Sequence, residues 1–228
     1  MRGILAEVRG DWQFFAHCFR FPAHNLKAGI CWKCDVAPAT LRELTSQAPW
    51  RSNRLTHWDN MVRWHQQGVS SSTICGAPFL TCKCFQMDWL HAVDQGVAAD
   101  FLGNLFWMCL PKLPGRSRKQ QTQEMFMLTQ DYYDRKQVDS RFSDLTTKLN
   151  FKSLKVGPKL RAKAAEARGL LDFGVELAEG LLSNNKPVEA TAKLCARHLA
   201  DCYSNLSSQN CDSEAMTCKL HPVSHLVH

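Results

Sequence analysis

The densest group of residues able to do chemistry is "MDWLHAVDQG", residues 87–96, where Asp88, His91 and Asp94 are spaced three apart beside apolar side chains. Residues three apart share a helix face, so Asp88 could fix the tautomer of His91 and support a metal site from its second layer. The alternative is that Asp88 caps a helix and His91 is an ordinary core histidine. Taken alone, the spacing favours this alternative.

The sequence "CWKC" places Cys31 and Cys34 at the spacing with which two thiolates grip one Zn²⁺ ion. A structural zinc site needs four ligands, and the sequence does not identify the other two. Five residues are candidates for them: Cys82, Cys84, His24, His57 and His91. A pair of free thiols is the alternative. A redox role is a weaker third interpretation, because no βαβ pattern surrounds the motif.

Two further motifs place carboxylates at defined positions. Asp11 follows an expected short strand, "GILAEV", and precedes an expected amphipathic helix, "WQFFAHCF", so it is either a helix N-cap or a metal-binding carboxylate. Glu166 lies in "KLRAKAAEAR", which reads either as a solvated helix face or as a carboxylate among phosphate-binding cations. Four cations would then bind DNA: Lys159, Arg161, Lys163 and Arg168.

The elements that would position these residues predict an α+β fold that is mostly helical. Residues 1–27 are expected to form a strand and a helix, and residues 28–86 an irregular region rich in Cys and Trp. Residues 87–206 are expected to be helical, with one helix beginning at Pro158 and another at Pro187. The tail, residues 207–228, has no periodicity and is expected to be disordered.

The bulk composition is that of a globular protein: 45% hydrophobic and 21% charged residues in a chain of 228. A net charge of +7 suits a polyanionic partner without requiring one. No secretory signal is evident, and the longest apolar run is shorter than the roughly 20 residues that span a bilayer. We therefore expect an intracellular protein, nuclear or otherwise, that is neither secreted nor in a membrane. Its eleven cysteines would be reduced.

The order of these motifs is more informative than any one of them. An acid at a strand end, a CxxC twenty residues later, "DWLH", and a distant Glu together resemble an RNase H-like DDE transposase. The resemblance spans roughly residues 5–180 and is strongest to the CACTA-like lineages, then to hAT elements and the vertebrate V(D)J recombinase. It implies that Asp11 is the second catalytic carboxylate and that Asp88 and His91 form the C/D-x-x-H motif. Glu166 would be the third acid, in competition with Glu176, Glu179 and Glu189.

The resemblance also implies a mechanism, in which carboxylates including Asp11 and Glu166 hold two Mg²⁺ or Mn²⁺ ions for in-line attack on DNA. Their oxygens would then lie about 4–8 Å apart. The strand bearing the first catalytic Asp is missing from the pattern. We therefore expect a truncated RNase H-like core that is inactive by itself, with an exposed sheet edge that favours homo-oligomers.

The competing hypothesis is a zinc-stabilised, mostly helical protein-interaction module without catalysis. Its binding surface would use tryptophans, which often anchor interfaces. Five are concentrated in residues 28–91: Trp32, Trp50, Trp58, Trp64 and Trp89.

Overall fold

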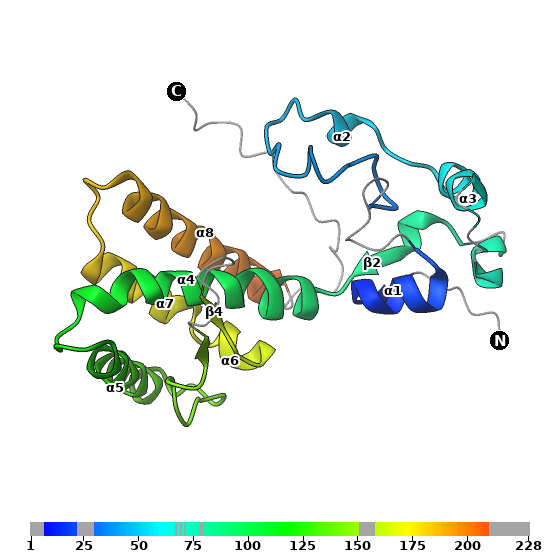
Figure 1. The fold of residues 1–228 in the computed structure, drawn as a ribbon. Coiled ribbons are helices and arrows are strands. Elements are labelled where there is room, and N and C mark those ends of the chain that lie inside the picture. The colour runs from blue at the N-terminus through cyan, green and yellow to red at the C-terminus, as the bar shows by residue number, and fades with distance from the viewer. Residues whose placement is uncertain are drawn as a thin grey trace. The chain divides into compact units, whose positions relative to one another are not determined.

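A computed structural model describes residues 7–21, 30–66, 68, 70, 72–77, 80–150 and 158–209. These residues form two compact units: unit 1, the described residues from 7 to 88, and unit 2, those from 89 to 209. Helices dominate, and the strands of the described residues are short (Figure 1). The predicted class, a mostly helical α+β fold, is confirmed. None of the described helices combines the length and the apolar character needed to cross a membrane.

Unit 1 is organised by two short parallel strands, β1 (Val8–Gly10) and β2 (Phe85–Met87). The helix α1 (Trp12–Phe19) follows β1 directly, as the sequence predicts. Asp11 begins this helix, because its Oδ1 atom accepts a hydrogen bond of 2.6 Å from the backbone N–H of Phe14. The expected strand over residues 3–8 falls mostly outside the described residues, and the observed strand begins at Val8.

The described residues between α1 and β2 include long irregular stretches. They also contain α2 (Pro49–Ser52), α3 (His57–Gln66), and the short helical turns η1 (Thr73–Gly76) and η2 (Cys82–Cys84). The core of unit 1 is aromatic: Phe21 stacks on Trp64 with ring centroids 5.1 Å apart and meets Phe85 edge-on at 4.7 Å. Trp32 and Trp64 are only 2% and 1% exposed, so these two tryptophans stabilise the unit and are not available to a partner.

Unit 2 consists mainly of helices. In chain order they are η3 (Leu90–Ala98), a π-helix, then α4 (Ala99–Cys109), η4 (Leu110–Lys112), α5 (Arg118–Lys136), α6 (Ala164–Arg168), α7 (Leu171–Leu181) and α8 (Pro187–Gln209). A small antiparallel pair joins β3 (Leu149–Asn150) to β4 (Lys159–Leu160). The helix α4 packs against α7 and β4, next to which it runs in Figure 1. Its buried face, which includes Leu102, Leu105 and Phe106, forms the centre of the core.

Two helix boundaries test the sequence predictions. The last helix begins at Pro187, as predicted, and reaches Gln209, so residues 207–209 are helical rather than part of a disordered tail. Residues 210–228 lie outside the described residues. The helix predicted from Pro158 is wrong at its start, because Lys159 and Leu160 form β4 and α6 begins only at Ala164.

A glycine in α4 explains this difference. A Cβ atom at Gly103 would lie 2.6 Å from both the carbonyl oxygen of Pro158 and the backbone nitrogen of Leu160. The extended backbone of β4 therefore lies directly against α4, at a distance that only glycine permits. Asn104 strengthens this contact by donating a 3.2 Å hydrogen bond to the carbonyl of Pro158.

The substitution Gly103→Ala should lower the free energy of unfolding by about 2 kcal/mol or more, because an added methyl group in a packed site forces the backbone apart. Gly180→Ala in α7 is the matched control, since nothing lies within 4 Å of its added Cβ. That control should be neutral or gain up to about 1 kcal/mol from helix propensity. Urea unfolding followed by circular dichroism measures both, and equal stability of the two variants would contradict the contact.

Candidate functional site

Asp11 and Asp88 occupy equivalent positions at the carboxyl ends of β1 and β2. Gly10 pairs with Met87 in the parallel register, so the next residue of each strand is an aspartate. The backbone N–H of Asp88 donates to the carbonyl of Gly10 at 2.9 Å, which extends the pairing to the aspartates. Neighbouring strands are about 4.8 Å apart, so two half-buried carboxylates share one sheet edge. Such an edge can hold a divalent cation.

The capping role of Asp11 is compatible with metal binding. The N-cap bond to Phe14 engages the Oδ1 atom, and a carboxylate carries a second oxygen with further lone pairs. The cap also fixes the direction of the side chain relative to β1. Asp11 is therefore held on the junction between β1 and α1, as a metal-binding carboxylate would require.

The other residues of the predicted catalytic set belong to unit 2. His91 is an exposed residue of η3. Glu166 is buried at the start of α6, where its Oε2 atom accepts a 2.7 Å hydrogen bond from the backbone of Lys163 and lies 3.3 Å from the ammonium of Lys148. Glu166 thus caps a helix. Because Asp11 and Glu166 lie in different units, their convergence stays a prediction.

The three competing glutamates are also engaged in ion pairs. Glu176 pairs with Arg135, Glu179 with Lys193, and Glu189 with Lys112. Hydrogen bonds, first from the backbone of Ser183 and then from Lys112, lower the pKa of Glu189 to about 2. Each of these carboxylates therefore has a structural role in unit 2.

Asp94 is the buried acid of "MDWLHAVDQG" and a functional residue that the sequence motifs alone do not single out. Its side chain is fully buried and lies 2.6 Å from the Nη2 atom of Arg168, while the hydroxyl of Tyr203 donates to its other oxygen. Burial and this bond to Asp94 raise the pKa of Tyr203. The contacts join η3, α6 and α8. The signal in the sequence was an aspartate that continues the three-residue spacing of Asp88 and His91 and directly follows the apolar residues Ala92 and Val93.

The four predicted DNA-binding cations divide into two pairs. Arg168 binds Asp94, and Lys159 pairs with Asp100 at 3.0 Å. Arg161 and Lys163 are exposed, and neither side chain forms an ion pair with another described residue. Arg161 and Lys163 are therefore better placed than the other two to contact a polyanion.

Two groups of cysteines lie near each other in unit 1: one contains Cys31 and Cys34, and the other contains Cys82. Burial, followed by the proximity of Cys31, raises the pKa of Cys34 to about 11. Burial likewise raises the pKa of Cys82 to about 12, and the Nδ1 atom of His57 lies 3.4 Å from its sulfur. A raised pKa keeps both Cys34 and Cys82 in the protonated thiol form near neutral pH.

The described residues do not supply the full ligand set of a structural zinc site. Among the described residues, no three or more His, Cys, Asp or Glu side chains are grouped so as to hold a metal ion. The CxxC brings two sulfurs together, but a structural zinc site takes four ligands. His24, one of the candidate ligands, lies outside the described residues.

Comparison with protein-family models, with curated proteins and with solved structures gives no match to this chain.

Arg168→Met should destabilise unit 2 by about 1–3 kcal/mol, because it leaves the buried Asp94 carboxylate without its counter-ion. This loss of stability is smaller than for a fully buried ion pair, because the Arg168 side chain is 54% exposed. Arg161→Met, an exposed cation of the same segment, is the control and should change stability little. Asp94→Asn combined with Arg168→Met should recover part of the loss in urea unfolding. Equal stability of the two arginine variants would remove the role assigned to Arg168.

Alkylation with iodoacetamide near the ordinary thiol pKa of about 8.5 should separate the cysteines by exposure, because only the thiolate reacts. The exposed residues Cys18, Cys195 and Cys202 should react quickly, while Cys75 and Cys82 stay protected. Mass spectrometry of the digested protein measures this order. A chelator should accelerate modification of Cys31 and Cys34 only if they hold zinc. Reaction of Cys82 as fast as Cys18 would contradict the buried environment.

Proposed function

We propose that this chain forms part of an RNase H-like catalytic domain of the DDE transposase kind, which carries out metal-dependent chemistry on DNA. One observation carries the proposal: Asp11 and Asp88 follow directly after two in-register parallel strands, at the same end of the pair. The carboxyl ends of parallel strands are where α/β folds collect their site residues. This arrangement supports the RNase H-like core that the sequence resemblance implies.

In this proposal the two aspartates supply rigid oxygen ligands. The strand pairing fixes the backbone of each, and the N-cap bond of Asp11 limits its rotation, so little entropy is lost when both carboxylates bind one cation. Divalent ions bound in such a site activate a water or a DNA 3′-hydroxyl and stabilise the leaving oxygen. His91 would complete the C/D-x-x-H motif with Asp88, and Glu166 would supply the third acid.

DNA is the proposed partner, and its phosphates would be neutralised by cations outside the metal site. Arg161 and Lys163 suit this role because their exposed side chains have no ion pair among the described residues. The excess of 28 Lys and Arg over 21 Asp and Glu gives an attraction of the same sign over the whole chain. Such binding weakens steeply as salt rises.

The zinc-stabilised interaction module is less well supported. It needs a second pair of zinc ligands, and it needs exposed tryptophans on a common surface. Trp58 is 74% exposed, but Trp32 and Trp64 are core residues. The carboxylate edge also has no part in that alternative, whereas the transposase-like function accounts for it.

The metal site is tested by titrating the full chain with Mn²⁺ and following the free ion by electron paramagnetic resonance. The wild-type chain should bind Mn²⁺, and Asp11→Asn and Asp88→Asn should each weaken binding about tenfold, equivalent to roughly 1.4 kcal/mol for one lost ligand. Asparagine caps helices as well as aspartate does, so Asp11→Asn should preserve α1. Circular dichroism checks that it does.

The matched control is Asp35→Asn, which removes a mostly exposed carboxylate of the same unit that pairs with Arg63. Its Mn²⁺ affinity should equal that of the wild-type chain. If all three variants bind Mn²⁺ as the wild type does, or if the wild type binds none, the proposed carboxylate site is wrong.

A further inference from the structure

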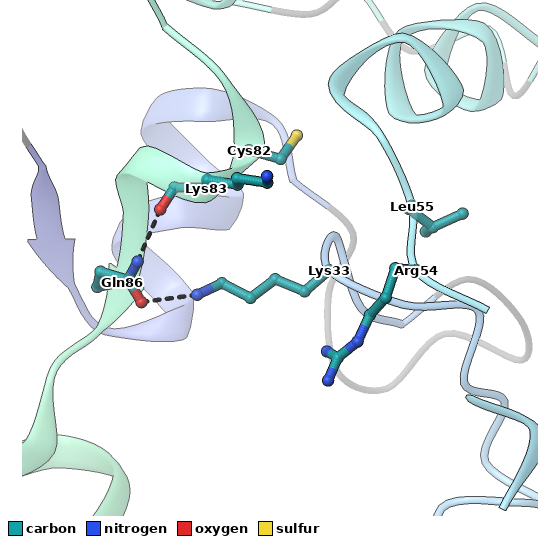
Figure 2. Close-up of a pocket in the computed structure, with 6 residues that line it drawn as sticks. All are labelled: Lys33, Arg54, Leu55, Cys82, Lys83 and Gln86. Atoms are coloured by element: carbon teal, nitrogen blue, oxygen red, sulfur yellow. Dashed lines mark hydrogen bonds between the residues drawn. The ribbon is translucent and has the colours of Figure 1, made fainter. Parts of the chain in front are cut away.

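A pocket of ≈ 320 Å³ lies within unit 1, between η2 and the irregular chain around the CxxC (Figure 2). Three of its lining residues are cations, Lys33, Arg54 and Lys83, and they come from three separate segments. The remaining lining residues are neutral: Leu55, Cys82 and Gln86. Pockets of this size accommodate small ligands.

The charges around this pocket are unbalanced. No Asp or Glu lines it, and none of the three cations forms an ion pair with another described residue. Lys33 instead donates a 2.6 Å hydrogen bond to the side-chain oxygen of Gln86, and Gln86 in turn donates to the carbonyl of Lys83 at 2.6 Å. These bonds, dashed in Figure 2, hold Lys33 and Gln86 in a fixed orientation.

The backbone fixes Lys33 and Arg54 next to each other. An isolated antiparallel bridge joins Cys34 to Arg54, and the N–H of Leu55 donates to the carbonyl of Lys33 at 3.1 Å. Lys83 is held through its neighbour Cys82, whose sulfur accepts a 3.3 Å hydrogen bond from the buried side chain of Asn60. The fold therefore places the backbones of these three cationic residues around one pocket.

Partial burial destabilises the charged form of the Lys33 side chain. Burial is the main cause that lowers the pKa of Lys33, and the charge of Arg54 acts in the same direction. A bound anion would offset both effects, because it restores a favourable partner for a partly desolvated ammonium. A carboxylate ligand offers one negative charge to these cations, whereas a phosphate group offers up to two and more acceptor oxygens.

We infer that this pocket binds a phosphate group, with Lys33, Arg54 and Lys83 as the charged contacts and Gln86 as the residue that orients Lys33. The inference goes beyond the proposed function, since it needs neither a divalent ion nor the two aspartates. Two sources share this chemistry: free inorganic phosphate and a phosphodiester of the DNA backbone. Gln86 precedes Asp88 by two residues, so a backbone phosphate held here would be close to the carboxylate edge.

The test uses the full chain in metal-free buffer, with inorganic phosphate as the first probe and isothermal calorimetry as the measurement. The variant that combines Arg54→Gln with Lys83→Met removes two charges from side chains with no hydrogen bond to another described residue, so it should fold normally. Its phosphate affinity should fall at least about tenfold, or roughly 1.4 kcal/mol. Lys33→Met, which also breaks the bond to Gln86, is a second variant with the same expected direction.

Arg42→Gln is the charge control, because Arg42 is an exposed cation of unit 1 outside the pocket lining. Its phosphate affinity should match that of the wild-type chain. The inference is overturned if the wild-type chain binds no phosphate, or if the double variant binds it as well as the control does. Mn²⁺ binding measured separately tells failure of this inference apart from failure of the carboxylate site.

A second arm distinguishes the two phosphate sources. Fluorescence anisotropy with a labelled DNA duplex over a salt series gives the number of phosphates contacted, and each lost contact reduces the slope by about one. A slope smaller by about two in the double variant, with no change in the control, identifies the DNA backbone as the source. Lost phosphate binding with an unchanged DNA slope identifies free phosphate instead.

Discussion

Three pairs of residues, from Val8 opposite Phe85 to Gly10 opposite Met87, join two parts of the chain that are far apart in sequence. The aromatic core of unit 1 and the position of its two aspartates both depend on this pairing. It closes the irregular segment that contains the CxxC, and it brings Phe85 against the aromatic side chains that follow β1. It also sets the register that makes Asp11 and Asp88 neighbours. A shift by one residue would turn Phe85 out of the core, so the buried aromatic cluster and the carboxylate edge are fixed together.

Unit 2 depends in a comparable way on one buried charge. Asp94 is stabilised inside the protein only because Arg168 and Tyr203 reach it from two later helices. A buried ion pair contributes less to net stability than its attraction suggests, since both charges lose water. Its larger effect is on specificity: any packing of α6 or α8 that separates these groups leaves a buried carboxylate without a partner. The aspartate thus selects one arrangement of the helices.

The parts of the fold that were predictable from sequence are those set by local signals. The helix after Asp11 follows from an N-cap before an apolar-periodic stretch, and the helix at Pro187 follows from a proline in its first turn. The strand β4 was missed because its cause is distant: Gly103, more than fifty residues earlier, admits its backbone. Local propensity favoured a helix there, and the tertiary contact prevailed.

The candidate site was predictable to a similar degree. Asp11 and Asp88 were identified from their flanking residues, but their shared register could not be read without knowing that β1 and β2 pair. The cationic pocket left no sequence motif, because its three charged residues, Lys33, Arg54 and Lys83, lie far apart in the sequence. Glu166 and Arg168 show the converse limit, since a basic helix segment that suits DNA contacts equally suits a cap and a buried ion pair.

The π-helical form of η3 makes the length of this segment matter more than most of its side chains. Each π-helical turn contains more residues than an α-helical turn, so the segment accommodates extra residues without breaking the helix. Removing one residue would rotate the chain before it relative to α4 by about 100°, the angle between successive residues of an α-helix. Asp94 would then face away from Arg168. Natural variation in "LHAVDQGVA" should therefore take the form of replacements at exposed positions such as Gln95 and Val97, while deletions are excluded.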